Sequence, residues 1–206
     1  LRKYRKATNY LLVGIRFFPG DYLVHYYLGT AFYRIRSYGA GIRHLNTSIR
    51  LKSDFMKAYQ NLGLLYRKIR RYNLAEKTYL KGLSINEDSD ELYFNLGRIY
   101  EITNKLPVAL LCFKKSLILN TKDEYYSYQV AQVYIKMKKW DKALYFLKKT
   151  LRINRDYAPA QYNLGYIYET QKKNNTLAAY HYNYFLKLKP YSRFKARILK
   201  FLKLGK

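Results

Sequence analysis

A repeat of 34 residues restricts the fold of this 206-residue chain more than any other feature of its sequence. Five blocks start at Tyr22, Met56, Asp90, Glu124 and Ala158. Every block has an aliphatic residue at position 7, a small residue at positions 8 and 20, an aromatic residue at position 11 and a large apolar residue at position 24. Five columns that agree over five blocks indicate one structural unit used five times.

The spacing of the apolar residues predicts two helices in each block, at positions 1–14 and 17–30. Small residues at positions 8 and 20 let these helices approach closely, and large residues at positions 7, 11 and 24 fill the space beside them. The fifth block keeps this pattern if one residue is inserted near Asn174 and Asn175. The small residues are Gly29, Gly63, Gly97, Ala131 and Gly165 at position 8, and Gly41, Ala75, Ala109, Ala143 and Ala178 at position 20.

The hexapeptides NLGLLY at Asn61–Tyr66, NLGRIY at Asn95–Tyr100 and NLGYIY at Asn163–Tyr168 carry a family signature. The pattern resembles that of the tetratricopeptide repeat family over essentially the whole chain. This resemblance implies an all-α fold, a right-handed α-solenoid of antiparallel helix hairpins whose first helices line a concave groove.

The repeat register predicts a single solenoid domain over residues 1–206, with eleven helices in hairpins and a further C-terminal helix. Phe185 stands at position 27, where earlier blocks carry a small residue, which favours a capping helix over a sixth repeat. The expected segments are a partial repeat at 1–21, repeats at 22–55, 56–89, 90–123, 124–157 and 158–190, and a capping helix at 191–206.

The resemblance also implies that positions 2, 5, 6, 9, 12 and 13 face the groove. Position 6 is an amide in four blocks, and an amide can hold the backbone of an extended peptide because it both donates and accepts hydrogen bonds. Two alternatives remain open: Asn is common at this position in the family, and the tyrosines can pack between repeats. The candidate residues are Asn61, Asn95, Gln129, Asn163, Tyr26, Tyr27, Lys57, Arg67, Phe94, Arg98, Tyr125, Tyr128, Tyr162 and Tyr166.

The charge is strongly positive, with 40 Lys and Arg against 13 Asp and Glu and a net charge of +27. Such a field attracts nucleic acid, anionic lipid or acidic proteins. A biased composition is the alternative, since Lys, Tyr, Asn and Ile are all abundant. The segment 193–206 has a basic amphipathic pattern that favours a cap on the last hairpin over a helix lying on a membrane.

No pattern of catalytic, cofactor-binding or metal-binding residues is present. His25, His44 and His181 are expected to be far apart and lack Cys or carboxylate neighbours at ligand spacing. Cys112 is the only cysteine, is expected in the core, and fits either the cytosol or a bacterial periplasm. We therefore expect a non-enzymatic scaffold that binds proteins or extended peptides and helps assemble a complex.

Two other functions remain open: a basic solenoid that binds nucleic acid or an anionic membrane surface, and the recruiting arm of a larger enzyme. The chain lacks an initiator Met and begins inside a predicted helix, which suggests a fragment of a longer protein. The longest apolar runs are shorter than a membrane span. The compartment stays unassigned, with the cytoplasm as the default.

Overall fold

A computed structural model describes residues 2–204, and in this range the chain forms twelve helices and no strand. This confirms the predicted all-α fold of eleven helices plus a C-terminal helix. The helices are α1 (Arg2–Phe17), α2 (Tyr22–Arg34), α3 (Tyr38–Leu51), α4 (Met56–Lys68), α5 (Tyr72–Leu83), α6 (Asp90–Ile102), α7 (Leu106–Leu119), α8 (Glu124–Lys136), α9 (Trp140–Ile153), α10 (Ala158–Thr170), α11 (Asn175–Leu188) and α12 (Lys195–Leu204).

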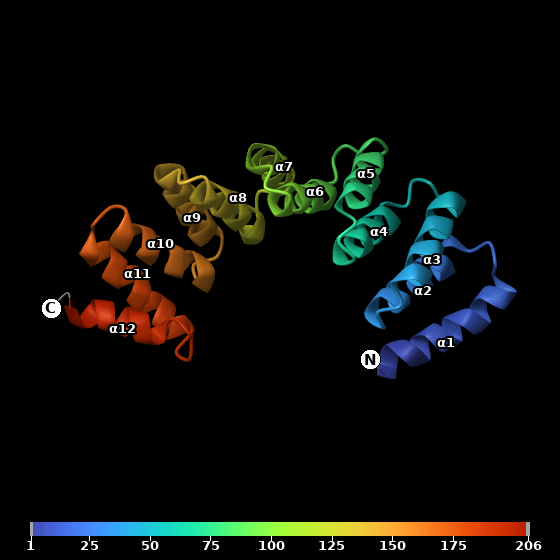
Figure 1. The fold of residues 1–206 in the computed structure, drawn as a ribbon, viewed down its shortest axis with the longest axis horizontal. Helices are drawn as coiled ribbons and strands as arrows, with labels where there is room; N and C mark the ends of the chain where they lie inside the picture. The colour runs from blue at the N-terminus through green and yellow to red at the C-terminus, as the bar shows by residue number, and fades with distance from the viewer. Residues whose placement is uncertain (1, 205–206) are drawn as a thin grey trace. The chain divides into compact units, whose positions relative to one another are not determined.

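Each first helix begins at the first residue of a sequence block, and each packs against the second helix of the same block (Figure 1). The chain divides into two compact units, residues 1–119 and residues 120–206. The first unit contains α1 and the hairpins α2/α3, α4/α5 and α6/α7, and the second contains α8/α9, α10/α11 and α12. No helix in residues 2–204 combines the length and the apolar character needed to cross a membrane.

The core follows the repeated columns. The residues at position 24, which are Leu45, Tyr79, Phe113, Leu147 and Tyr182, are completely buried. In four of the five hairpins they pack beside the glycine at position 8 of the facing first helix. A Cβ added at Gly97 would lie 2.8 Å from the Phe113 ring, and one added at Gly165 would lie 2.6 Å from the Tyr182 ring. The small residues are therefore required by close helix contacts, as the sequence predicts.

The turn inside each hairpin contains a residue with left-handed backbone conformation, with φ between 51° and 66°. Helices commonly end in this way, with the residue at this position bonded back to the last helical turn. In the second hairpin the Arg70 N–H donates to the Arg67 carbonyl at 3.1 Å, and the Arg71 N–H donates to the Tyr66 carbonyl at 2.9 Å. The five left-handed residues are Arg36, Arg70, Asn104, Lys138 and Lys173.

The turns between hairpins are held by the side chain at position 4 of the next first helix. Tyr59 Oη donates to the Ser53 carbonyl at 2.9 Å, and Gln161 Nε2 donates to the Arg155 carbonyl at 3.0 Å. His25 Nε2 lies 3.1 Å from the Pro19 carbonyl in the same arrangement. Three different polar residues thus fix the same connection in three repeats.

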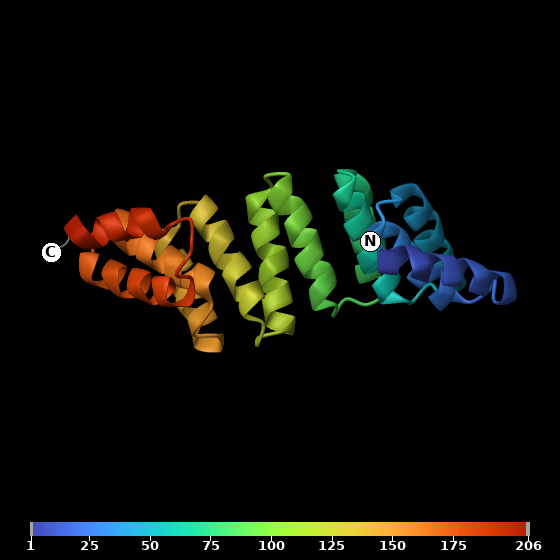
Figure 2. The same cartoon turned by 90° about the horizontal axis from the view of Figure 1, so that it is seen from below.

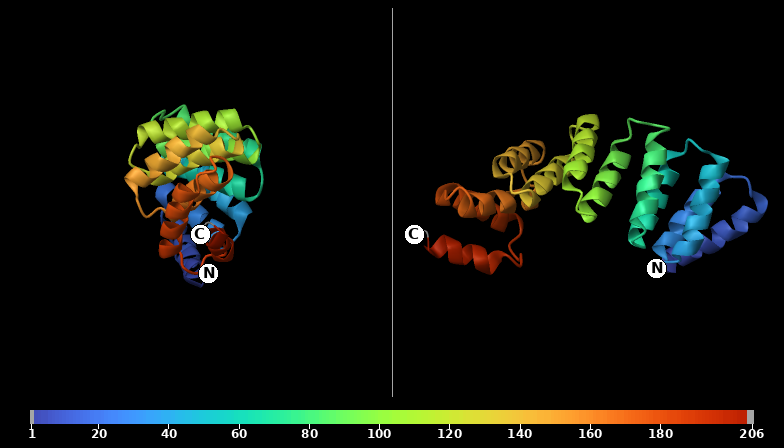
Figure 3. Two further views of the ribbon diagram at one scale, coloured as in Figure 1. Left: turned by 90° about the vertical axis from the view of Figure 1, so that its left-hand side faces the viewer. Right: turned by 45° about the horizontal axis from the view of Figure 1, so that its top comes forward.

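The C-terminal helix starts at Lys195, four residues later than the predicted boundary at 191. Residues 190–194 form a turn instead, in which the Ser192 N–H donates to the Lys189 carbonyl at 3.1 Å. Pro190 has no N–H group to continue a helix, which accounts for the turn. Within the second unit, α12 runs beside α11 (Figure 3).

Candidate partner-binding surface

In the first unit, successive first helices are joined through a candidate amide. Asn61 on α4 donates from Nδ2 to Thr30 Oγ1 on α2, at 3.0 Å. Asn61 also lines a small hollow of about 90 Å³ together with Tyr33, Arg34 and Leu64. The amide therefore has a structural bond on one side and an open hollow on the other.

The other candidates of this unit differ in how accessible they are. Tyr27 is 53% exposed, and Lys57 is also exposed. Tyr26 is half-buried because its ring lies edge-on to Phe55, with centroids 5.0 Å apart. The remaining candidates, Arg67, Phe94, Asn95 and Arg98, are half-buried, and Arg98 pairs with Glu101 at 2.9 Å.

In the second unit the amides at position 6 have different environments. Gln129 is only 5% exposed, so it lies inside the protein rather than on an open surface. Asn163 on α10 is half-buried and donates from Nδ2 to Tyr128 Oη on α8, at 3.1 Å. This bond uses one N–H of the Asn163 amide and leaves its other N–H and its carbonyl oxygen for a ligand.

Asn163 lies at the wall of an open pocket of about 360 Å³ within the second unit. Aromatic rings and two cationic side chains surround this pocket. It is lined by Tyr128, Ala158, Pro159, Tyr162, Asn163, Phe185, Lys189, Arg193 and Phe194. Three of the predicted groove residues, Tyr128, Tyr162 and Asn163, are thus brought together. The other lining residues come from the start of α10 and from residues 185–194.

The pocket combines aromatic rings with two basic side chains. Burial raises the pKa of Tyr128, although its bond to Asn163 acts in the opposite direction. Burial also raises the pKa of Tyr157, whose ring centroid lies 5.1 Å from that of Tyr128. Lys189 and Arg193 are exposed at the rim. An apolar or aromatic side chain with a neighbouring carboxylate would find complementary chemistry here.

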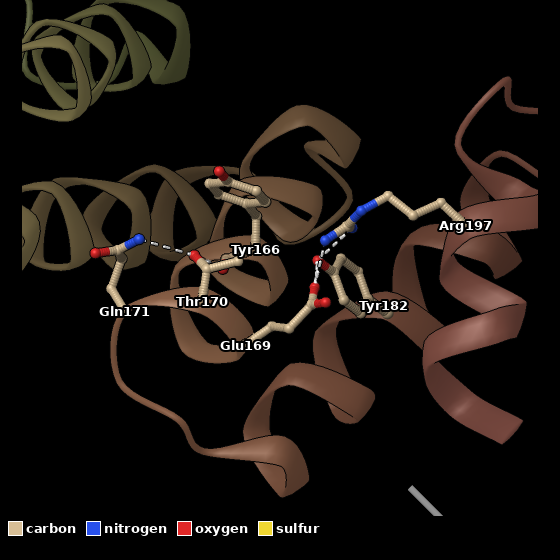
Figure 4. A network of polar contacts seen from close by, with 6 residues as sticks. All are labelled: Tyr166, Glu169, Thr170, Gln171, Tyr182 and Arg197. Carbon is tan, nitrogen blue, oxygen red and sulfur yellow. Dashed lines mark hydrogen bonds and ion pairs between the residues drawn. The ribbon is translucent and has the colours of Figure 1, made fainter. Parts of the chain in front are cut away.

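The C-terminal helix and the turn before it contact two predicted groove residues, Tyr162 and Tyr166. The Tyr162 ring stacks on Phe194 with centroids 4.3 Å apart, and the Arg197 guanidinium lies 5.5 Å from the centre of the Tyr166 ring. Arg197 also donates to Glu169 at 2.6 Å and to Tyr182 Oη at 2.8 Å (Figure 4). Tyr162 and Tyr166 therefore hold the C-terminal turn and helix against the last hairpin.

The apolar face of α12 packs against the last hairpin. Ile198 is completely buried, and the Phe201 ring lies edge-on to Tyr182 with centroids 5.5 Å apart. The predicted capping role of the C-terminal helix is confirmed. Phe185, the bulky residue at position 27, contacts Phe194 with centroids 6.4 Å apart, which explains its size at this end of the array.

The expectation that all three histidines are far apart is wrong for His25 and His44. Their Nδ1 atoms lie 3.2 Å apart, because positions 4 and 23 of one repeat face each other across the hairpin. His181 and Gln161 occupy the equivalent positions and lie 2.8 Å apart. These contacts join residues 19 and 20 positions apart, a separation that helical periodicity within one helix does not reveal.

Cys112 lies in the core, as the sequence predicts. Burial raises the pKa of its thiol to about 11, which keeps it protonated and a poor nucleophile at neutral pH. Among residues 2–204, no three His, Cys, Asp or Glu side chains are grouped closely enough to hold a metal ion.

Comparison with known proteins gives a consistent picture of the fold. Residues 57–89 match the family model for the tetratricopeptide repeat. No curated protein matches the chain. Among solved structures, PilF of Pseudomonas aeruginosa is similar with a TM-score of 0.78 and 16% identity, and the alignment covers 99% of this chain and 90% of that one.

Two further structures have described partners or sites. YrrB, described as a tetratricopeptide-repeat protein with an unusual peptide-binding site, has a TM-score of 0.71 and 18% identity, over 92% of this chain and 97% of that chain. The Cut9–Hcn1 hetero-tetramer of the APC/C has a TM-score of 0.73 and 20% identity, over 97% of this chain and 39% of the matched chain. At these identities the likeness shows a common fold.

Proposed function

We propose that this chain is a non-catalytic scaffold of tetratricopeptide repeats that binds segments of partner proteins and helps assemble a complex. One observation carries this proposal: the open pocket at Tyr128, Tyr162 and Asn163, which has aromatic walls, a partly used amide and a cationic rim. Its volume of about 360 Å³ suits one or two side chains of a peptide rather than a large cofactor.

The proposed ligand is an extended segment with an apolar or aromatic side chain next to a carboxylate. The side chain enters between the rings, the carboxylate meets Lys189 and Arg193, and Asn163 holds the peptide backbone. In the first unit, Asn61 and Asn95 are proposed to hold a backbone in the same way. The described peptide-binding site of YrrB and the Cut9–Hcn1 assembly support a role of this kind for the fold.

Peptides selected from a random library against the whole chain provide the test. The variant Asn163→Ala should weaken their binding by roughly threefold to tenfold, since a hydrogen bond contributes about 0.5–1.5 kcal/mol. Asn183→Ala is the matched control, because Asn183 is an exposed amide on α11 outside the pocket. Equal affinities of both variants would place the binding surface elsewhere.

The amide positions are tested together by Asn61→Ala, Asn95→Ala and Asn163→Ala in one chain. A peptide held by the first unit should lose affinity roughly fivefold to a hundredfold through the Asn61 and Asn95 changes, if the losses add, and one held by the second unit should respond to the Asn163 change alone. Asn61 and Asn163 also bond to the neighbouring first helix, so this variant should lose about 1–3 kcal/mol of stability. Affinities are therefore compared at a temperature where circular dichroism shows the variant folded.

A further inference from the structure

The turns inside the hairpins of the first unit form an edge of concentrated positive charge. Figure 2 shows the α4–α5 and α6–α7 turns at one edge of this unit and the α5–α6 connection at the opposite edge. We call the first of these the hairpin-tip edge. Its basic residues are Arg34, Arg36, Arg67, Lys68, Arg70, Arg71 and Lys105.

Acidic residues are scarce at this edge, where Glu101 stands at the repeat position of Arg67, and they are concentrated on the other. No Asp or Glu occurs in segments 34–38, 66–72 and 102–106. Six of the eight acidic residues of the first unit lie at the connections between hairpins, which are Asp21, Asp54, Glu87, Asp88, Asp90 and Glu91. All the basic residues of the hairpin-tip edge are exposed except Arg67, which is half-buried. The charge is thus separated between two edges of one unit.

Neither the stability of the fold nor the composition of the chain accounts for all the basic residues of this edge. Arg36 and Arg70 have left-handed backbone conformation, where Gly or Asn would cost less free energy. The helix dipole favours Arg34, Arg67 and Lys68, which lie in the last turns of α2 and α4. It does not favour Arg71, which precedes the positive end of α5. The whole chain has 25 Lys and 15 Arg, whereas this edge has two Lys and five Arg.

The chemistry of the edge favours a phosphate polymer over an acidic protein surface. Tight protein interfaces are anchored by aromatic residues in desolvated pockets. The aromatic residues of these segments, Tyr38, Tyr66 and Tyr72, instead pack inward against the hydrophobic core. The exposed chemistry is therefore mainly guanidinium and ammonium groups, and guanidinium matches phosphate with two parallel hydrogen bonds.

The turns also recur at a regular interval that suits a linear polyanion. The first helices α2, α4 and α6 contact one another in sequence, and contacting helices have axes about 8–10 Å apart. We propose that the hairpin-tip edge of residues 1–119 binds the phosphate backbone of a nucleic acid without reading its sequence. This activity is separate from peptide binding, since the two surfaces share no residue that the test below replaces.

The test compares two variants of the whole chain that lose the same charge. The edge variant carries Arg36→Asn, Arg70→Asn, Arg71→Gln and Lys105→Gln. Asn is used at the two left-handed positions because it tolerates that conformation, as Asn104 does in the third hairpin. The control variant carries Arg16→Gln, Arg43→Gln, Arg50→Gln and Lys81→Gln, which are exposed residues of the same unit away from the hairpin tips.

Binding to labelled duplex DNA of two unrelated sequences is measured by fluorescence anisotropy between 50 and 200 mM salt, a range over which phosphate contacts weaken steeply. The edge variant should bind on the order of 100-fold more weakly at the lowest salt. Its slope of log affinity against log salt should fall by roughly three to four, because each lost phosphate contact contributes about 0.9. The control variant should keep the parental slope, and both DNA sequences should bind equally.

Three results would overturn the proposal. The two variants could lose affinity equally, which would assign binding to net charge alone. Polyglutamate could compete as well as DNA at equal charge, which would point to an acidic protein. Anionic lipid vesicles could bind the edge better than DNA does, which would point to a membrane surface. Thermal denaturation followed by circular dichroism establishes that each variant is folded.

Discussion

At the scale of single residues, His181 links the stability of the second unit to pH. Its Nδ1 lies 2.8 Å from Gln161 Oε1, so the ring donates from that nitrogen. Burial, with a smaller effect of Lys148, lowers its pKa to about 4 from the usual 6.5. The unfolded chain then binds a proton more readily than the folded chain does. The stabilisation is therefore complete above pH 6.5 and is lost as the pH falls toward 4.

The denaturant midpoint should accordingly be lower at pH 4.5 than at pH 7. Burial and the charges of His25 and Arg43 lower the pKa of His44, which adds to the effect in the same direction. His181→Gln should flatten the dependence between pH 7 and pH 4.5, because Gln does not titrate. Chemical denaturation of both proteins across this range is the measurement. Parallel profiles for parent and variant would show that His181 does not carry the effect.

Glycines in the helices fall into two groups that can be separated by alanine substitution. A Cβ at Gly63 would overlap the buried Tyr79 ring, so Gly63→Ala should destabilise the protein by about 1–3 kcal/mol. Gly14 lies within α1 and has no atom within 4 Å of such a Cβ. Gly14→Ala should therefore stabilise by about 0.5–1 kcal/mol. Thermal denaturation that gave both changes the same sign would contradict this distinction.

At the scale of helices, Arg197 is the main polar attachment of α12. It bonds both Glu169 and Tyr182, whereas Lys200 on the same helix is exposed. Because the pair is partly exposed, its loss should cost only about 1 kcal/mol. Arg197→Ala should then speed hydrogen exchange in α12 by about fivefold, and Lys200→Ala should leave it unchanged. Equal exchange in these variants would assign the attachment to the apolar contacts alone.

The hairpins were predictable because their determinants lie at fixed spacing. Gly97 and Phe113 are in contact because positions 8 and 24 of a repeat face each other. The residues at these two positions set the helix packing in the remaining hairpins too. The bonds of Arg197 were not predictable, since Arg197 lies outside the repeat pattern and 28 residues from Glu169. The left-handed turn residues were also missed, because Arg and Lys are not typical of that conformation.

The candidate surface was predicted only in part. Tyr128, Tyr162 and Asn163, which the family pattern predicts on the groove face of the first helices, line one pocket. The same positions did not reveal that Gln129 is buried, or that Phe194 covers one side of Tyr162. These outcomes depend on what packs next to each helix. Phe194 lies outside the repeats, where no column constrains its place.

At the scale of the whole molecule, the sequence predicts one array, and the structure divides into two compact units at residues 119 and 120. The 34-residue period continues through this point without a change in register. The free energy of unfolding of a repeat protein is close to the sum of the stabilities of its repeats and of the interfaces between neighbouring repeats. A local defect should therefore affect its own unit first, which a single substitution can test.

Tyr134 in the second unit is suited to that experiment. It is 3% exposed and its ring stacks on Phe146 with centroids 5.6 Å apart, so Tyr134→Ala should cost about 3–5 kcal/mol. Hydrogen exchange should accelerate throughout α8–α11, while α2–α5 in the first unit retain most of their protection. Tyr145→Ala is the control, because Tyr145 is 61% exposed in the same unit and its loss should change stability by less than about 0.5 kcal/mol. Equal loss of protection in both units would mean that the chain unfolds as one cooperative body, and unchanged protection would remove Tyr134 from the core.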